Sequence, residues 1–222
     1  MSADILLGFG DSWPSGADLA PLGEKNYLTQ LAEHFGIDSI NFSRGGSSIP
    51  HLILQINEFI KTQYCPNNRY HAVFFLTTKE RTFVYNNDRI VEFSPGYVND
   101  NNTDNARGES YYKHIYDDQL GTFNLNITVL ALQQICATYG IKDYYTAGWQ
   151  EIELWPTINR TKFFADGKPI TTVFTADNKF RSLKDLIIES NPYVVHPNCP
   201  PGHPNQQGHA KIAQALANWI KI

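Results

Sequence analysis

The stretch Ile5-Leu6-Leu7-Gly8-Phe9-Gly10-Asp11-Ser12 sets the fold class of this 222-residue chain. Its first five residues are apolar apart from one glycine, which is typical of a strand covered on both faces in a parallel sheet. The run then ends in small and polar residues. In an open parallel sheet, ligands bind at the loops that follow the carboxyl ends of the strands. We therefore expect a buried first strand that delivers Asp11 and Ser12 to a site.

The rest of the chain alternates short apolar runs with helical patterns. Further strands are predicted at residues 39–42, 72–76 and 143–146. Apolar residues recur at helical spacing in residues 28–35, 52–60, 120–139 and 212–220. Because strands alternate with helices, we predict an α/β fold with a parallel sheet that carries helices on both faces.

Residues 82–118 interrupt this alternation. They are rich in Asn, Asp and Tyr, and they include the turn-like sequence Ser94-Pro95-Gly96. The segment is too long for an ordinary connection between a strand and a helix. We interpret it as an insertion, with a small hairpin around residues 83–85 and 90–93, within a single domain that spans residues 1–222.

Composition and charge exclude several classes of protein. Hydrophobic residues make up 42% of the chain, which is enough for one sizeable core and excludes disorder. The formal net charge is −4, whereas nucleic-acid binders usually have a strong basic excess, so no nucleic-acid partner is expected. No run of about 18 apolar residues occurs, so no membrane partner is expected either.

Targeting signals and metal motifs are not evident in the sequence. The first twelve residues have no basic region and no apolar stretch of secretory length, which leaves the localisation cytoplasmic or unknown at this point. Cys65, Cys136 and Cys199 are scattered, without a Cys-x-x-Cys pair, and the histidine spacing is not a metal signature. We expect no cofactor and no metal. The sequence does not indicate an oligomeric state.

Four segments hold the residues that follow predicted strands or precede the last helix. They are Gly8-Phe9-Gly10-Asp11-Ser12-Trp13, Ser43-Arg44-Gly45-Gly46-Ser47-Ser48, Thr77-Thr78-Lys79-Glu80-Arg81 and Pro201-Gly202-His203-Pro204-Asn205-Gln206-Gln207-Gly208-His209. Together they contain a hydroxyl nucleophile, a glycine turn and a histidine. These are the residue types that acyl-transfer chemistry requires.

The order and spacing of these segments resemble the SGNH (GDSL-type) hydrolase family. The family's first block is Gly-Asp-Ser after strand one, which Gly10, Asp11 and Ser12 match. Its second block is an Asn-led turn with a glycine, matched by residues 41–46. Its last block has the catalytic His before Pro-Asn, matched by residues 203–213. The resemblance covers essentially the whole chain.

The resemblance implies a flavodoxin-like fold and a set of catalytic roles. The fold would be a three-layer α/β/α sandwich with a central parallel sheet of about five strands. Ser12 would be the nucleophile, His203 the general base, and the amides of Ser12 and Gly46 would donate to the oxyanion. Asp11 is expected to hold the turn rather than to take part in catalysis.

Two positions depart from the family pattern. The third block, Gly-x-Asn-Asp, supplies an Asn side chain to the oxyanion, but this chain has Thr77-Thr78-Lys79-Glu80 there. We expect Lys79, Arg81 or a threonine hydroxyl to replace that donor. The family also places an Asp three residues before the His, where this chain has Pro200. The imidazole would then be oriented by a backbone carbonyl near Cys199 or Pro200, or by a carboxylate such as Asp177 or Asp185.

These features predict a serine esterase that works through an acyl-enzyme, with a Ser-His dyad or a triad. Trp13, Trp149 and Arg81 follow strand ends and are candidates for substrate binding, with core packing as the alternative role of the tryptophans. The polar, aromatic insertion favours O-acyl groups, such as acetyl, on carbohydrate or another small ester. The alternatives are a catalytically impaired carbohydrate-binding module and an O-acyltransferase.

Overall fold

The computed structural model describes residues 2–16, 19, 23–86, 89–95, 102–148, 150–168, 170 and 203–222. In these residues, four parallel strands form the central sheet in the order β2-β1-β3-β6. They are β1 (Asp4–Phe9), β2 (Asp38–Asn41), β3 (Arg69–Leu76) and β6 (Lys142–Ala147). The parallel sheet is confirmed, with four strands in the described part of the chain rather than about five. Beyond β6, Phe163 adds only an isolated bridge to Tyr145.

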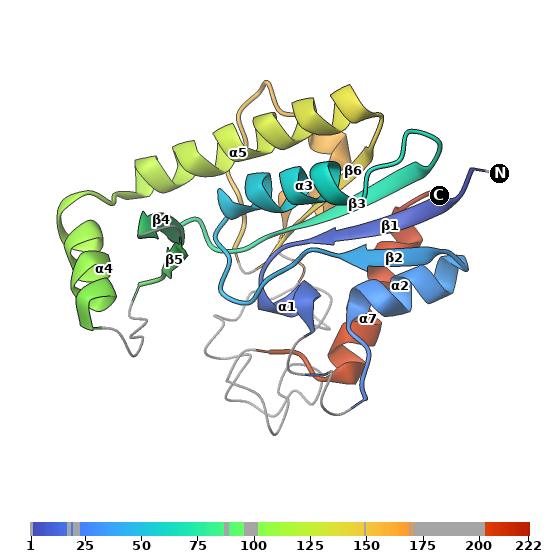
Figure 1. The fold of residues 1–222 in the computed structure, drawn as a ribbon, viewed down its shortest axis with the longest axis horizontal. Coiled ribbons are helices and arrows are strands. Elements are labelled where there is room, and N and C mark those ends of the chain that lie inside the picture. Colours follow the sequence, from blue (N-terminus) through green and yellow to red (C-terminus); the bar gives the residue numbers. More distant parts are fainter. Residues whose placement is uncertain are drawn as a thin grey trace.

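Helices cover both faces of this sheet, as Figure 1 shows. On one face lie α3 (His51–Thr62) and α5 (Asp118–Tyr139), and on the other lie α2 (Tyr27–Phe35) and α7 (Gln206–Trp219). The predicted three-layer α/β/α sandwich is therefore confirmed. None of the helices in the described ranges is both long enough and apolar enough to cross a membrane.

The two cores follow from the alternation of side chains along β3. Ala72, Phe74 and Leu76 point to the face covered by α3 and α5, whereas Val73 and Phe75 point to the face covered by α2 and α7. All five side chains are buried. A strand with both faces covered needs apolar residues at every position, which explains the continuous apolar run in the sequence.

The insertion contains the predicted hairpin and a helix that was not predicted. Strands β4 (Thr82–Asn86) and β5 (Arg89–Phe93) pair antiparallel, and α4 (Asn102–His114) follows. The sequence of α4 is strongly polar, so it shows no apolar stripe that predicts a helix. The buried Asp104 on α4 contacts Arg89 and accepts a hydrogen bond of 3.2 Å from Asn86. The helix is therefore tied to the hairpin by polar contacts.

Candidate active site

Ser12 and His203, which are 191 residues apart in the chain, meet at the carboxyl edge of the sheet. The Ser12 Oγ lies 2.8 Å from the His203 Nε2. Ser12 begins the short helix α1 (Ser12–Ser15) directly after β1, and His203 lies three residues before α7. At this distance, a serine hydroxyl can pass its proton directly to a neutral imidazole. The structure thus brings together the two residues that the sequence proposes as nucleophile and base.

The buried carboxylate of Asp11 holds the turn that carries Ser12. Its Oδ1 accepts from the Trp13 amide at 3.1 Å, which caps the start of α1. Its Oδ2 accepts from the Thr77 hydroxyl at 2.8 Å and from the Arg81 Nη1 at 3.0 Å. Asp11 therefore has the structural role expected for it, and it links the nucleophile turn to the segment that follows β3.

The charges around Asp11 oppose the cost of burying it. Burial raises the pKa of the Asp11 carboxyl, because a desolvated carboxylate is less stable than a hydrated one. The Arg81 guanidinium and the hydrogen bonds from Thr77 and the Trp13 amide act in the opposite direction on the same pKa. Arg81 thus binds Asp11, and the Thr77 hydroxyl is also directed at that carboxylate.

The glycine turn that follows β2 lies beside the nucleophile. A Cβ placed on Gly45 would lie 4.0 Å from the Cβ of Ser12. Gly46 has a φ of +80°, a conformation that L side chains rarely adopt, and among the described residues no atom beyond its chain neighbours lies within 4 Å of the place where its Cβ would be. The space on the Cβ side of Gly46 is therefore free of the other residues that the structure describes.

Gln55 on α3 joins the two turns, and no motif in the sequence points to it. Its Oε1 accepts from the Gly10 amide at 2.9 Å, and its Nε2 donates to the Gly10 carbonyl at 2.8 Å. The same Nε2 donates to the Ser47 Oγ at 3.1 Å. Only 1% of Gln55 is exposed, so these contacts replace water for a buried amide. One side chain thus fixes the nucleophile turn relative to the glycine turn.

The asparagine of the second block ties β2 to α1. The Asn41 Nδ2 donates to the Pro14 carbonyl at 2.6 Å, and its Oδ1 accepts from the Ser43 amide at 3.0 Å. The Arg44 amide in turn donates to the Gly10 carbonyl at 3.1 Å. These bonds satisfy backbone groups where both strands end, and they bring the glycine turn next to Ser12.

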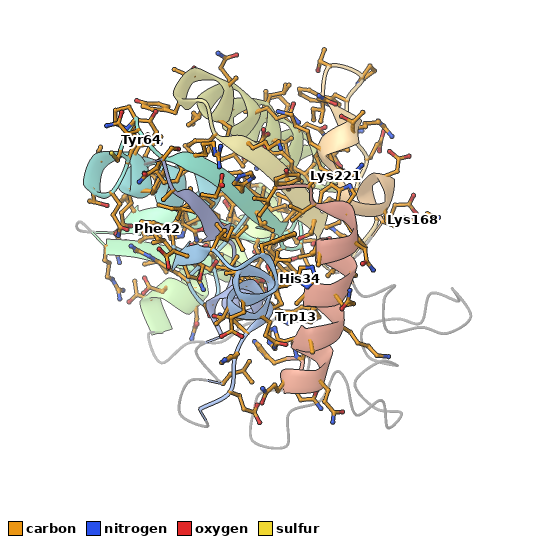
Figure 2. All side chains as sticks on the ribbon, turned by 90° about the vertical axis from the view of Figure 1, so that its right-hand side faces the viewer. Trp13, His34, Phe42, Tyr64, Lys168 and Lys221 are labelled. Atoms are coloured by element: carbon orange, nitrogen blue, oxygen red, sulfur yellow. The ribbon has the colours of Figure 1, made fainter. Side chains whose placement is uncertain are left out.

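The other predicted site residues lie elsewhere. The Lys79 ammonium donates to Asp118 at 2.8 Å and to Thr122 at 3.2 Å, both on α5. Trp13 is fully buried and packs against Phe75, with ring centroids 5.6 Å apart, so the structure favours its packing role (Figure 2). Trp149 and the candidates for orienting His203, namely Asp177, Asp185, Cys199 and Pro200, fall outside the described residues.

His209 is close to His203 in the sequence, but its side chain is buried in a different environment. Its Nδ1 accepts from the Tyr27 amide at 3.1 Å, and its ring stacks on the Tyr27 ring. Burial, with a smaller effect from the charge of His203, lowers the pKa of His209 to about 3. A ring that is neutral and bound to a backbone amide connects α7 to α2, so His209 has a structural role.

Comparison with known proteins gives matches at the level of structure. The sequence matches no protein-family model and no curated protein. Among solved structures, a protein assigned to the lipolytic G-D-S-L family from Desulfitobacterium hafniense has 9% identity and a TM-score of 0.52, and the match covers 97% of this chain and 99% of that one. A catalytic mutant of an acetylxylan esterase from Geobacillus stearothermophilus has 15% identity and a TM-score of 0.51, with 100% and 98% covered.

A third structure, an α/β hydrolase enzyme from the metagenome of Lake Arreo, has 10% identity and a TM-score of 0.51, with 98% of this chain and 95% of that one covered. Each match extends over nearly the full length of both chains. At such low identities, these likenesses establish the architecture. The chain therefore has the fold of the G-D-S-L (SGNH-type) hydrolases.

Proposed function

We propose that this protein is a serine ester hydrolase. The observation that carries the proposal is the 2.8 Å contact between the Ser12 Oγ and the His203 Nε2, next to the open turn at Gly46. The resemblance of the Gly10-Asp11-Ser12 and His203-Pro204-Asn205 segments to the family motifs agrees with this geometry. A non-catalytic carbohydrate-binding module would have no need for a hydroxyl in hydrogen-bond contact with an imidazole.

The reaction begins with an attack of the Ser12 oxygen on the ester carbonyl carbon. The Ser12 proton passes to the His203 Nε2, and the carbonyl oxygen becomes an oxyanion held by the amides of Ser12 and Gly46. The bond to the leaving alcohol then breaks, and the His203 Nε2 returns its proton to that alcohol oxygen. Water next attacks the acyl-enzyme, gives a proton to His203, and the acid leaves as the Ser12 hydroxyl re-forms.

The hydrogen bonds to the oxyanion have a large effect on the kcat of such an enzyme. Loss of a single oxyanion donor costs roughly 10²–10³ in kcat. The Asn of the third block is replaced here, and the Lys79, Arg81 and Thr77 side chains are bound to other partners. From the part of the chain that the structure describes, the proposed oxyanion site therefore consists of the two backbone amides, and we expect a slow esterase.

The proposed substrates are O-acetyl groups on carbohydrate or on other small alcohols. An acetylxylan esterase is among the similar structures, although the likeness itself concerns the fold. An O-acyltransferase would use the same acyl-enzyme, with a sugar hydroxyl in place of water.

The test is hydrolysis of p-nitrophenyl acetate and of acetylated xylo-oligosaccharides by the wild type, Ser12→Ala and His203→Gln. Ser39→Ala and His114→Gln are matched controls, because both positions are exposed and lie outside the proposed site. We expect both site variants to lose activity by at least about 10³-fold and the controls to keep it. Release of free acetate distinguishes hydrolysis from transfer to a sugar acceptor. Unchanged activity in Ser12→Ala or His203→Gln would contradict the proposal.

A further inference from the structure

The β4–β5 hairpin contacts both turns of the proposed active site through charged side chains. Arg81, which precedes β4 directly, binds Asp11 in the nucleophile turn at 3.0 Å. Glu92 on β5 reaches the glycine turn, where its Oε2 accepts from the Ser48 amide at 3.1 Å. Its other oxygen, Oε1, contacts the His51 Nδ1. The hairpin therefore touches the site at two separate places.

The Glu92 contact spans a long stretch of sequence and is partly shielded from water, with 21% of the Glu92 side chain exposed. Glu92 is 44 residues from Ser48 and 41 from His51, so the contact forms only when the insertion packs on the core. The side chain of His51 is 6% exposed, and the ring of Phe83 on β4 lies 5.6 Å from its ring. A carboxylate that accepts from a backbone amide and an imidazole in such surroundings makes strong, well-directed hydrogen bonds.

The glycine turn is exposed at Gly46 and has one hydrogen bond of its own, from the Ser47 amide to the Arg44 carbonyl at 3.2 Å. In the described ranges, no atom beyond its chain neighbours lies within 4 Å of the place where the Gly46 Cβ would be, and glycine is the residue with the greatest backbone freedom. The two residues that follow it are both held by distant side chains. Gln55 binds the Ser47 hydroxyl, and Glu92 binds the Ser48 amide. The turn bond and these two side-chain contacts together hold the backbone that carries the Gly46 amide.

The hairpin is itself held by further contacts. The buried Asp104 on α4 binds Arg89 and Asn86 at the tip of the hairpin. At the other end, the Tyr112 hydroxyl donates to the Glu80 carbonyl at 2.9 Å. Glu92 is therefore presented to the glycine turn by a unit that is fixed at both of its ends.

We propose that Glu92 is a positioning residue that aims the Gly46 amide at the oxyanion, so that the inserted hairpin completes the oxyanion site from outside the sheet. This inference rests on the proposed function. Since only two backbone amides are proposed to hold the oxyanion, a misplaced Gly46 amide removes a large part of its stabilisation. Because the oxyanion forms only after the substrate is bound, the effect falls on kcat and leaves KM nearly unchanged.

The experiment compares Glu92→Ala, Glu92→Asp, Glu92→Gln and the control Glu109→Ala, which removes an exposed carboxylate from α4 of the same insertion. With p-nitrophenyl acetate, we expect Glu92→Ala to lower kcat about 10–100-fold, less than the loss of a whole donor, with KM changed less than about 2-fold. Glu92→Asp, which keeps the charge on a shorter side chain, is expected to lower kcat less. Glu92→Gln keeps an acceptor for the Ser48 amide, so it should restore most of kcat.

A second readout does not depend on activity. Amide hydrogen exchange of residues 46–48, measured in the folded full-length protein, should be at least about 10-fold faster in Glu92→Ala than in Glu109→Ala. If the wild type hydrolyses no ester, the proposed function fails, and the exchange rates still decide whether Glu92 holds the turn. Exchange rates and kcat in Glu92→Ala and Glu92→Asp that equal those of the control would overturn the inference.

Discussion

The Arg81 guanidinium donates to the carboxylate of Asp11 across 3.0 Å, so a partly exposed cation neutralises a fully buried anion one residue before the proposed nucleophile. The contact crosses 70 residues of sequence and joins the end of β1 to the segment that follows β3. Loss of one partner from a buried ion pair is costly, because the other charge stays buried without compensation.

Replacement of Arg81 by Gln should therefore destabilise the fold by about 3 kcal/mol at neutral pH. Burial raises the pKa of Asp11 in the folded state, so the folded protein binds the proton more tightly than the unfolded chain does. The loss should be smallest at acidic pH, where Asp11 is protonated in both folded proteins, and should grow as the pH rises above the raised pKa of Asp11 in the folded wild type, because only the ionised carboxyl needs the guanidinium. Urea unfolding of the wild type and of Arg81→Gln at several pH values measures this loss of unfolding free energy.

The control for Arg81 is Arg107→Gln, since the Arg107 side chain is half exposed and lies 3.9 Å from Asp104. Surface ion pairs contribute about 0–1 kcal/mol. A loss in Arg81→Gln no larger than in this control would show that the guanidinium does not compensate Asp11.

Replacement of Gly10 by Ala should disturb the nucleophile turn. A Cβ at this position would come 2.6 Å from the Pro14 Cγ and 2.8 Å from the Phe75 Cβ, which are parts of the packed core. Overpacking of this kind costs about 1–3 kcal/mol, and it would also displace Ser12. We expect a lower melting temperature together with a lower kcat. Gly108→Ala is the control, because its Cβ would make only ordinary contacts with Phe93, and equal effects in both variants would contradict the prediction.

Replacement of Lys79 by Met tests the side chain that the sequence offers as an oxyanion donor. Its ammonium binds Asp118 and Thr122 on α5, so we expect kcat for p-nitrophenyl acetate to stay within about 3-fold of the wild type. A fall of about 100-fold or more would show that Lys79 leaves α5 during the reaction and donates to the oxyanion.

Replacement of His209 by Asn should reduce the acid sensitivity of the fold. The pKa of His209 is lowered to about 3, so between that value and 6.5 the unfolded chain takes up a proton that the folded protein does not. The wild type should consequently lose about 2 kcal/mol through this group when the pH falls from 7.5 to 5. An Asn Oδ1 can accept from the Tyr27 amide without titrating. His209→Asn should therefore lose less unfolding free energy than the wild type over the same pH change.

The pH dependence of His209→Asn is read from urea unfolding at pH 5 and pH 7.5. His34→Asn, at an exposed position on α2, is the control for removal of a histidine. If His209→Asn and the wild type lost the same free energy of unfolding between the two pH values, His209 would not be the buried neutral group described above.

Patterns along the chain predict most of the sheet and its covering helices. Continuous apolar runs mark the strands at residues 5–9 and 72–76, because both faces of these strands are covered. Helical spacing marks α5, which packs through one face. The polar helix α4 has no such pattern, since it is held through Asp104 rather than through an apolar stripe.

The site is only partly predictable from sequence. Motifs indicate Ser12 and His203, and the structure places their side chains within hydrogen-bond distance. Gln55 and Glu92 escape prediction, because their contacts run between distant segments and depend on how the helix and the hairpin pack. The same reason explains Arg81, which the sequence offers to the substrate or the oxyanion but which the fold directs to Asp11.

The most direct test of the proposed chemistry is the reaction of the full-length protein with a fluorophosphonate probe, followed by mass spectrometry of the adduct. Such probes form a covalent bond with a serine whose oxygen is activated by a base. We predict a single adduct on Ser12, lost in Ser12→Ala and formed much more slowly in His203→Gln. No adduct on Ser12 in the wild type, or equal labelling in Ser12→Ala, would contradict the assignment of a serine hydrolase.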